Sequence, residues 1–339
     1  MRIATWNVEW FNSLFDAKDQ PVSDQKWSGR WNVKRNAQLD AIAHVLREIG
    51  ADAVMVIEAP DSYAKRSSTK ALENLAARYN LRLSKAISGF ANETQQEITL
   101  MYDPAKLIVE HDPKGALTAG GTTSPRFDTE FSRDLDVDAS PEKVVFSKPP
   151  LELSVVTKAG NALRLIGVHA KSKAPHGART NSAARRISIE NRRKQLAQCV
   201  WIRKRVEEHL TAGDDLIVLG DFNDGPGLDE FEKLFGRSGV EVVLGEAGNN
   251  CLFDPHARQA LLRRGIAIPT TSRFFLRNEN RYLSALLDYI MVSANLRKLK
   301  PSWRIWHPFD DGDCYRDEKL RESLLAASDH FPVTLDIDL

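Results

Sequence analysis

Cysteine is scarce in this sequence of 339 residues, and long apolar runs are absent from it. Cys199, Cys251 and Cys314 are odd in number and far apart, which excludes a disulfide framework and a metal-thiolate motif. We interpret them as structural thiols. No apolar stretch approaches the roughly 20 residues that a membrane-spanning helix needs. The chain opens with MRIATWNVEWF, which shows no signal peptide, so we expect a cytoplasmic protein.

Neither sign of charge dominates, because the net charge is +1, so the overall balance indicates no class of partner. The distribution is uneven, since residues 171–205 carry eleven Lys or Arg against the single Glu190. This local balance of +10 leaves −9 for the rest of the chain. On composition alone, a solvated basic helix explains this segment better than an anion-binding face does.

Hydrophobic residues make up 42% of the chain and charged residues 27%, which is typical of a globular domain with an ample core. Helical spacing predicts a helix through Leu39 and Ile49 that ends at Gly50, a helix over 68–79, and a long helix within 185–210. Strands are predicted at 3–8, 53–57, 97–102, 106–110, 151–157, 162–169, 215–220, 240–244, 286–292 and 331–337. Two pairs read as hairpins: 97–102 with 106–110, and 151–157 with 162–169.

The stretch 111–150 is rich in Gly, Pro, Thr and Asp, and we expect it to be a loop insertion. The rest of the pattern mixes strands and helices, without an internal repeat or a low-complexity linker. It therefore favours one α/β domain over residues 1–339, with many hairpins.

Polar residues stand at the ends of several predicted strands. Each has an ordinary explanation as a turn, a cap or a buried hydrogen-bonding group. Six such segments are harder to explain in this way, because charged groups beside buried strands cost free energy unless they are paired or bind a metal. The residues are Asn7, Glu58, His169 with Lys171, Asp221 with Asn223, Asp288, and Asp329 with His330.

These side chains suit one kind of reaction. Carboxylates suit a hard cation such as Mg²⁺, which keeps several waters and binds a substrate phosphate. Amides and imidazoles can donate hydrogen bonds to phosphoryl oxygens, and an Asp–His pair favours the protonated imidazole. The sequence lacks the Cys/His spacing of a zinc site and the Gly-rich loop of a nucleotide triphosphatase. The residues therefore indicate hydrolysis of a phosphate ester.

An ordered set of motifs resembles the endonuclease/exonuclease/phosphatase superfamily, which has the deoxyribonuclease-I-like fold. The motifs are TWNVEWF, VIEAPD, FSKPPLEL, GVHAKSK, LGDFND, LLDYIMVS and SDHFPV. The resemblance runs from Thr5 to Val333, nearly the full chain. It implies a four-layer α/β sandwich, in which two packed mixed β-sheets are flanked by helices. It also implies a divalent-metal phosphodiesterase or phosphomonoesterase.

The resemblance also implies the metal site. Glu58 corresponds to the principal metal ligand, and Asn7 and Asp329 to residues close to the metal. The implied cofactor is Mg²⁺, with Mn²⁺ or Ca²⁺ as alternatives. The Gln that often precedes the metal-binding Glu in this family is absent from VIEA.

Five catalytic residues are implied in the same way. Asp221 resembles the aspartate that positions or deprotonates the attacking water. Asn223 and His169 resemble the groups that hold phosphoryl oxygens. Asp288 and His330 resemble the orienting carboxylate and its histidine. Either Asp221 or His330 can serve as the base.

Four basic residues are candidates for binding the phosphate or the substrate: Lys148, Lys171, Lys173 and Arg179. Many members of the family have Arg where Lys148 precedes the double proline, and lysine keeps the charge but loses the bidentate fork. With the resemblance in view, the segment KSKAPHGARTNSAARR is expected near the active face, where it would meet a phosphodiester backbone.

The leading hypothesis is an endonuclease that cleaves DNA or RNA, so nucleic acid is the expected partner, and we favour a monomer. GVHAKSK resembles a motif of bacterial deoxyribonuclease-like members. The alternative is a phosphatase or phosphodiesterase for a small or lipid phosphate, although the inositol-phosphatase signatures are absent. The abasic-site repair branch is disfavoured because GDFND departs from its usual sequence. A non-catalytic binding module of the same fold ranks last.

Overall fold

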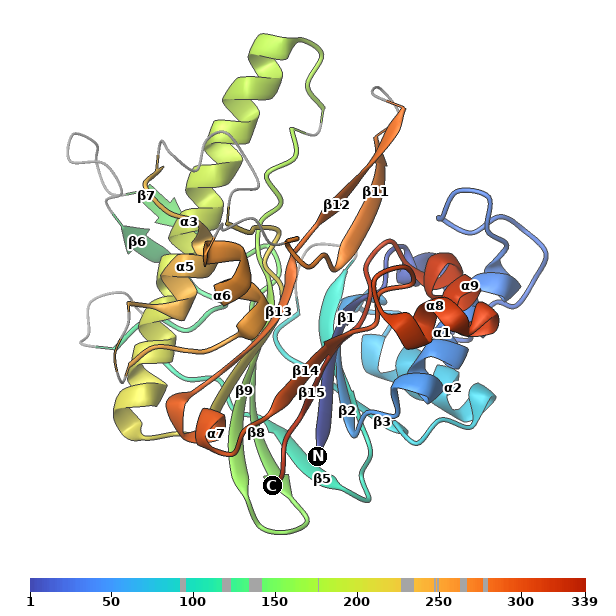
Figure 1. The fold of residues 1–339 in the computed structure, drawn as a ribbon, viewed down its shortest axis with the longest axis horizontal. Helices are drawn as coiled ribbons and strands as arrows, with labels where there is room; N and C mark the ends of the chain where they lie inside the picture. The colour runs from blue at the N-terminus through green and yellow to red at the C-terminus, as the bar shows by residue number, and fades with distance from the viewer. Residues whose placement is uncertain are drawn as a thin grey trace.

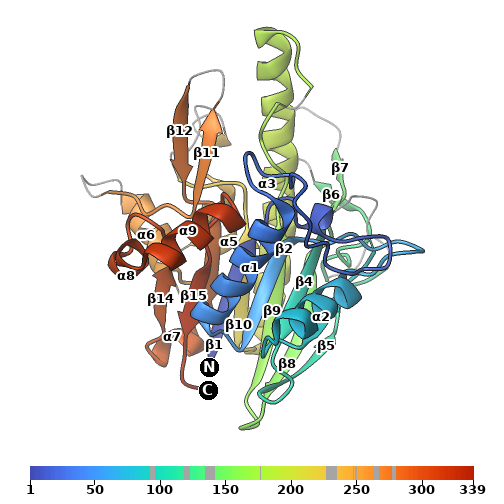
Figure 2. The same ribbon diagram turned by 90° about the vertical axis from the view of Figure 1, so that its right-hand side faces the viewer.

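The computed structural model describes residues 1–91, 96–117, 123–133, 142–175, 177–226, 235–246, 248, 250–262, 267–276 and 280–339. Within these residues the chain forms two large β-sheets that pack face to face, with helices on both outer faces (Figures 1 and 2). No helix among the described residues combines the length and the apolar character that crossing a membrane requires.

The first sheet has six strands among the described residues, in the order β14-β15-β1-β2-β4-β3. Strands β1 and β2 are parallel, and the other neighbours are antiparallel. The bounds are Ser302–Ile305 for β14, Val333–Asp336 for β15, Arg2–Asn7 for β1, Ala53–Ala59 for β2, Glu97–Tyr102 for β4 and Lys85–Ser88 for β3.

The second sheet has five strands among the described residues, in the order β13-β10-β9-β8-β5. Strands β9 and β10 are parallel, and the other neighbours are antiparallel. The bounds are Asp288–Val292 for β13, Leu216–Asp221 for β10, Ala162–His169 for β9, Leu151–Thr157 for β8 and Leu107–His111 for β5. Each sheet thus has one parallel pair near its centre.

Helices cover the outer face of each sheet (Figures 1 and 2). The first sheet packs against α1 (Arg35–Ile49), α2 (Ser68–Tyr79), α8 (Gly312–Arg316), α9 (Glu318–Ala327) and the short helix η1 (Phe11–Leu14). The second packs against α3 (Asn181–Ala212), α5 (Gly239–Leu244) and α6 (Pro255–Leu262), while α7 (Ala294–Lys298) follows β13. The expected four-layer α/β sandwich of the deoxyribonuclease-I type is confirmed.

Strand β10 shows why its sequence is apolar throughout. Leu216 and Val218 pack toward α3, whereas Ile217 and Leu219 pack between the two sheets. A strand that is buried on both faces has no position for a polar side chain until it ends. In β10 the side chain that follows this apolar run belongs to Asp221.

Several local predictions are confirmed. Helix α1 ends at Gly50, whose φ of 55° is the left-handed conformation that glycine adopts readily. Strands β8 and β9 form the predicted hairpin. The long helix α3 exceeds its predicted bounds and buries Leu196, Cys199 and Ile202.

Two predictions are wrong. Strands 97–102 and 106–110 do not form a hairpin, because β4 joins the first sheet and β5 pairs with β8 in the second. The turn at Asp103 therefore carries the chain from one sheet to the other. The predicted strand at 240–244 is helix α5, in which a capping box between Ser238 and Glu241 overrides the β-branched composition.

The predicted insertion at 111–150 contains a short two-stranded ribbon, β6 (Phe131–Arg133) and β7 (Glu142–Val144). Phe127, Phe131 and Phe146 pack around Trp201 of α3, which ties this region to the second sheet's helical layer. Residues 118–122 and 134–141 of the predicted insertion lie outside the described residues.

A second two-stranded ribbon, β11 (Ser272–Leu276) and β12 (Arg281–Ala285), has no counterpart among the predicted strands. Figure 1 shows this ribbon and the first half of α3 projecting from the same end of the molecule, opposite the two chain termini. Strand β1 starts near the N-terminus and runs toward the end of the molecule from which these elements project, and Asn7 is its last residue.

Candidate active site

The carboxyl ends of the two parallel strand pairs bring four of the predicted residues together. Asn7 ends β1, Glu58 is the penultimate residue of β2, and His169 and Asp221 end β9 and β10. The register of the second sheet places Asp221 between His169 on one side and Asp288 on the other. Parallel strands that start at one edge deliver their last residues to the opposite edge, which explains the convergence.

Glu58 adopts a strained backbone conformation. Its φ is 60°, and the pairing of β2 with β4 shifts register between Ile57 and Ala59. A left-handed non-glycine residue costs on the order of 1–3 kcal/mol, and such strain is concentrated at functional sites. The bulge turns the carboxylate toward Asn7 Nδ2, which lies 3.4 Å from Glu58 Oε1, and Gln96 Nε2 donates to the other carboxylate oxygen.

The Asn7 amide joins the two sheets. Its Nδ2 also donates to Asp221 Oδ2 at 3.0 Å, while its Oδ1 is buried and accepts no hydrogen bond from any described residue. A buried amide oxygen without a donor is costly unless something else binds it. Asn7 Oδ1 is therefore a candidate ligand for a cation.

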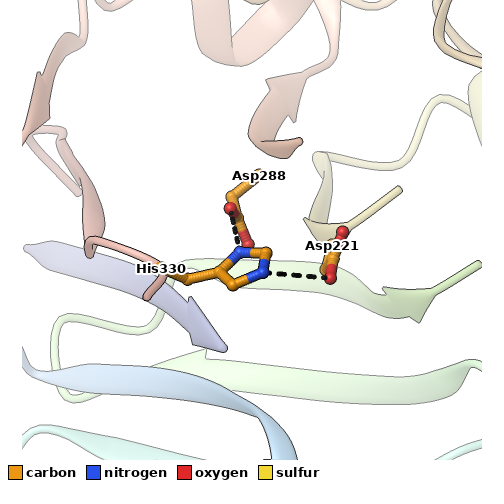
Figure 3. A group of neighbouring side chains, drawn as sticks. All are labelled: Asp221, Asp288 and His330. Carbon is orange, nitrogen blue, oxygen red and sulfur yellow. Dashed lines mark hydrogen bonds and ion pairs between the residues drawn. The ribbon is translucent and has the colours of Figure 1, made fainter. Parts of the chain in front are cut away.

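Asp288 and Asp221 lie on opposite sides of the His330 imidazole (Figure 3). His330 Nδ1 is 2.8 Å from Asp288 Oδ2, and Nε2 faces Asp221 Oδ2 at 4.0 Å. Thr271 Oγ1 donates to Asp288 Oδ2 at 2.8 Å and fixes that carboxylate. These contacts fix the imidazole ring between the two carboxylates.

The protonation states of His330 and Asp221 follow from their burial and from the charges beside them. Although burial opposes it, the neighbouring Asp288 and Asp221 raise the pKa of His330 well above its ordinary value. Burial, and then the charge of Asp288, raise the pKa of Asp221 to about 7. The imidazolium is thus the stable form of His330.

His169 is the opposite case, because burial and then the charge of Lys148 lower its pKa well below the ordinary value. Lys148 Nζ lies 3.2 Å from His169 Nδ1 and 2.5 Å from Gln96 Oε1. Since an ammonium can only donate, Nδ1 accepts and the ring proton is on Nε2. That Nε2 faces Asp221 Oδ2 at 3.9 Å and Glu58 Oε1 at 4.0 Å.

Asn223 is held beside Asp221 by a tight turn. Its backbone N–H donates to Asp221 Oδ1 at 2.7 Å, and its φ of 49° is left-handed. Its side-chain Nδ2 donates to the carbonyl oxygen of Ala170 at 3.1 Å. Gln195 of α3 donates to the carbonyl oxygens of Phe222 and Asn223, so the long helix supports this turn from behind.

Asp329 precedes His330 and contacts a different group. Its Oδ1 lies 3.9 Å from Arg30 Nη1, and Arg273 of β11 donates its backbone N–H to the Asp329 carbonyl oxygen. Burial raises the pKa of Asp329 to about 7, against the opposing effect of His330, and Glu9 adds to the rise.

A sequence model of the Endonuclease/Exonuclease/phosphatase family matches residues 4–330, which include all of these side chains. The chain belongs to this family. Membership makes it a phosphoester hydrolase of the nuclease or phosphatase type. No curated protein matches the sequence.

Solved structures of other proteins share the family's fold with this chain. Humanized TDP2 from D. rerio has a TM-score of 0.51 at 13% identity, with 99% of this chain and 98% of that chain covered. Truncated TDP2 from Caenorhabditis elegans has a TM-score of 0.50 at 14% identity, with 98% of this chain and 96% of that chain covered. The 3′ phosphatase NExo from Neisseria, bound to a product DNA hairpin, has a TM-score of 0.50 at 15% identity, with 100% of both chains covered. At these identities the likeness concerns the fold.

The Endonuclease/Exonuclease/phosphatase family generally depends on a divalent metal, and the buried oxygen atoms here fit one. Asn7 Oδ1 has no donor among the described side chains, and burial raises the pKa of Glu58 against the opposing effects of Lys148 and His330. Asp221, Asp288 and His330 also have atoms within 4.8 Å of one another. His330 Nδ1 is engaged by Asp288, however, so the Glu58–Asn7 pair is the better cation site.

The four basic candidates of this family member lie in different surroundings. Lys148 lies inside the cluster, and Lys171 lies near enough to lower the pKa of Lys148 and of His169, after the effect of burial. Lys173 Nζ pairs with Asp224 at 2.6 Å. Arg179 is exposed ahead of α3 and makes no ion pair with the described residues. Their contacts with substrate stay predictions.

Three residues of the site escaped the sequence analysis: Gln96, Thr271 and Gln195. Gln96 precedes β4 directly and resembles any polar residue at a strand start. Thr271 lies in a loop without a motif. Gln195 lies on the buried side of α3, where a polar residue inside an apolar stripe is the one signal that could have marked it.

Proposed function

We propose that this chain is a divalent-metal-dependent phosphodiester hydrolase, an endonuclease that cleaves DNA or RNA, with Mg²⁺ as its metal. One observation carries the proposal. The Nε2 atoms of His169 and His330 lie 3.9 and 4.0 Å from the same Asp221 oxygen, too far for direct hydrogen bonds. Such spacing suits a water or a phosphoryl oxygen held between the three side chains.

Asp221 would orient the attacking water and accept its proton, because its carboxylate is buried and held by Asn7 and the Asn223 backbone. His330, kept protonated by Asp288, would donate Nε2–H to a phosphoryl oxygen as negative charge develops there. His169, neutral with its proton on Nε2, would donate a second hydrogen bond. Asn223 Nδ2 donates to the Ala170 carbonyl oxygen at 3.1 Å and to Asp221 Oδ2 at 3.4 Å, and would turn the second N–H from Asp221 to the phosphate.

The metal would be held by Glu58 and Asn7, with Asp329 close by, and would supply positive charge that neutralises the phosphate and acidifies water. Lys148 supports this arrangement through Gln96, which links its ammonium to the Glu58 carboxylate.

A nucleic acid substrate is supported by the basic residues at the start of α3. Arg185 and Arg186 are exposed near the start of α3, in the half that projects beyond the sheets on the side of the site (Figure 1). The structure of NExo, which shares the fold, contains a product DNA hairpin. We also propose that the chain acts as a monomer in the cytoplasm, which light scattering and cell fractionation would test.

The second candidate is hydrolysis of a small or lipid phosphate. It uses the same catalytic side chains and needs no basic surface, so the substrate alone separates the two functions. A non-catalytic binding module has the least support, because all the catalytic side-chain types are present.

The deciding experiment compares plasmid DNA, single-stranded RNA and an aryl phosphodiester in Mg²⁺ or Mn²⁺. Asp221→Ala and His330→Ala proteins run beside the wild type. Nicking of plasmid that EDTA and both substitutions abolish would support the endonuclease and its site. Cleavage of the aryl diester alone would favour the small-substrate enzyme. Activity that survives both substitutions would refute the site, and inactivity on every substrate would favour the binding module.

A further inference from the structure

An unusual number of tryptophans is exposed in the segment that leads to α1. Of the seven tryptophans in the chain, all of which the structure describes, Trp10, Trp27 and Trp31 expose 51%, 57% and 84% of their surface. Trp6 and Trp201, by contrast, are fully buried. Indole side chains gain much from burial, so several exposed ones in one segment indicate a binding surface rather than a role in folding.

The segment that carries Trp27 and Trp31 is a defined loop. Trp27 and Lys34 form an antiparallel bridge, and Ser28 donates its backbone N–H to the Val33 carbonyl oxygen at 2.9 Å. Arg30 N–H donates to Ser28 Oγ at 3.2 Å. The backbone hydrogen bonds therefore define the conformation of the loop, in which the Trp31 side chain is exposed.

The loop is anchored at the active site. Arg30 donates to Glu9 Oε2 at 2.6 Å and to the Leu325 carbonyl oxygen of α9 at 3.0 Å, and it lies 3.9 Å from Asp329 Oδ1. Gly29 packs so closely on Trp10 that an added Cβ would lie 2.5 Å from the Trp10 Cβ. The exposed indoles thus belong to a surface that starts beside the predicted metal site.

The charge of the loop suits an anionic ligand. Residues 26–35, KWSGRWNVKR, contain four Lys or Arg and no Asp or Glu; Arg30 pairs with Glu9 and Arg35 with Asp24, whereas Lys26 is exposed and Lys34 is half-buried. Lys34 Nζ lies 3.2 Å from the centre of the Trp27 ring, a cation–π contact. The residues between Trp27 and Trp31 are Ser28, Gly29 and Arg30, which are polar or small, so this part of the loop lacks the run of apolar side chains that favours a lipid surface.

We propose that Trp27 and Trp31 form a stacking surface for the bases of a single-stranded nucleic acid segment next to the phosphodiester in the active site. The proposal rests on the proposed function and names its substrate class. Indoles stack with any base, and cations beside them hold the backbone, which is how proteins bind single strands without sequence preference. Lys26 and Lys34 would supply these cations. Arg30 links the stacking surface to Asp329.

The test measures binding and cleavage separately. Anisotropy of a fluorescein-labelled oligothymidylate in EDTA reports binding without hydrolysis and does not depend on protein tryptophans. Trp27→Ala, Trp31→Ala and Trp31→Phe are compared with Tyr315→Ala, which removes an aromatic ring that is 55% exposed on α8. The aryl phosphodiester reports the catalytic groups alone.

We expect Trp27→Ala and Trp31→Ala each to weaken oligothymidylate binding about tenfold, within the range that one base–aromatic stack is worth. Trp31→Phe should recover part of the loss, Tyr315→Ala should lose nothing, and hydrolysis of the aryl diester should be unchanged in all four variants.

Binding that changes less than twofold in both tryptophan variants would overturn the proposal. So would tryptophan-dependent binding to vesicles of phosphatidylserine and phosphatidylcholine without an effect on the oligonucleotide, which would indicate a lipid surface. A wild-type protein that binds the oligonucleotide through both tryptophans but hydrolyses nothing would leave this proposal standing and refute the proposed function.

Discussion

Each polar side chain at the site has its state set by its immediate neighbours. His330 and His169 are both buried, and burial lowers the pKa of each. Asp288 opposes this effect and raises the pKa of His330, whereas Lys148 adds to it and lowers the pKa of His169 further. One histidine is therefore a cation and the other a neutral donor, and both Nε2 atoms face Asp221. Two donors that border the same space beside Asp221 suit a reaction in which negative charge builds up on phosphate.

The role of Asp288 can be tested by removing its charge while keeping its shape. Asp288→Asn should lower kcat/KM for the aryl phosphodiester by roughly 100-fold or more, because the imidazole loses the carboxylate that orients it and stabilises its protonated form. Steady-state kinetics with Mg²⁺ measure the effect. The exposed Asp338→Asn serves as the control, and a Asp288→Asn protein with more than half of wild-type activity would contradict the role.

Gly220 precedes Asp221 and has a backbone that other residues rarely adopt. Its φ is 140°, and an added Cβ would meet the Val168 carbonyl oxygen at under 3.0 Å. Gly220→Ala should lower the free energy of unfolding by about 2 kcal/mol or more, through strain and displacement of β9. Urea denaturation measures the loss.

Gly160→Ala is the matched control for this substitution. Gly160 also has a positive φ, 91°, but nothing lies within 4 Å of its added Cβ. Gly160→Ala should lower the free energy of unfolding by only about 1 kcal/mol, because it adds backbone strain but no steric contact. Equal losses at the two positions would show that the contact with Val168 has no part in the effect.

At the scale of elements, short signals in the sequence decided between helix and strand. Residues 240–244 are VEVVL, which is typical of a strand, but Ser238 accepts from the Glu241 backbone and Glu241 accepts in return from the Ser238 backbone. This capping box satisfies the first donors of a helix and starts α5. Local hydrogen bonding thus outweighed β-propensity.

Helix α6 has a histidine that should make stability depend on pH. Burial lowers the pKa of His256 from 6.5 to about 4. The pKa of His256 is lower in the folded state than in the unfolded state, so the unfolded state gains a proton first as the pH falls. With respect to this group, the free energy of unfolding is therefore highest above pH 6.5 and decreases as the pH falls toward 4. We expect His256 to lower the free energy of unfolding by about 1–2 kcal/mol over this pH range, allowing for its partial exposure.

Urea denaturation of the wild type and of His256→Gln, at a series of pH values between 7 and 4, measures this contribution. The glutamine variant should lose less stability across the window, since it carries no group that must be protonated on unfolding. Curves that stay parallel across the whole range would show that His256 does not contribute.

On the scale of the whole molecule, the first half of α3, which carries Arg185 and Arg186, projects from the end of the molecule opposite both termini (Figure 1). Arg185→Gln with Arg186→Gln should weaken binding to DNA and reduce the slope of log affinity against log salt by roughly one to two, because each phosphate contact releases counterions. Anisotropy at several salt concentrations in EDTA measures this slope.

Arg316→Gln on α8 is the control, since its side chain is also exposed, at 75%. It should leave the slope unchanged. Cleavage of the aryl phosphodiester should stay at the wild-type rate in every arginine variant, because none of them contacts the catalytic side chains. A double variant with an unchanged salt slope would mean that this half of α3 does not meet the phosphate backbone.

The sequence alone determined the fold class and predicted the polar residues that end the central strands. Buried strands read as apolar runs that end in Asn7, Glu58, His169 and Asp221, and that pattern depends only on neighbours along the chain. The helix over 68–79 was predicted at its observed bounds for the same reason.

Only the tertiary structure decided which sheet each strand joins and which side chains meet. The Asn7 amide reaches Asp221 across 214 residues of sequence, and the crossing of β4 and β5 into different sheets has no local signal. The roles of Gln96, Thr271 and the exposed loop of Trp31 can be inferred only from the residues that lie beside them in the structure. Contacts of this kind depend on packing between distant segments, which short-range periodicity does not encode.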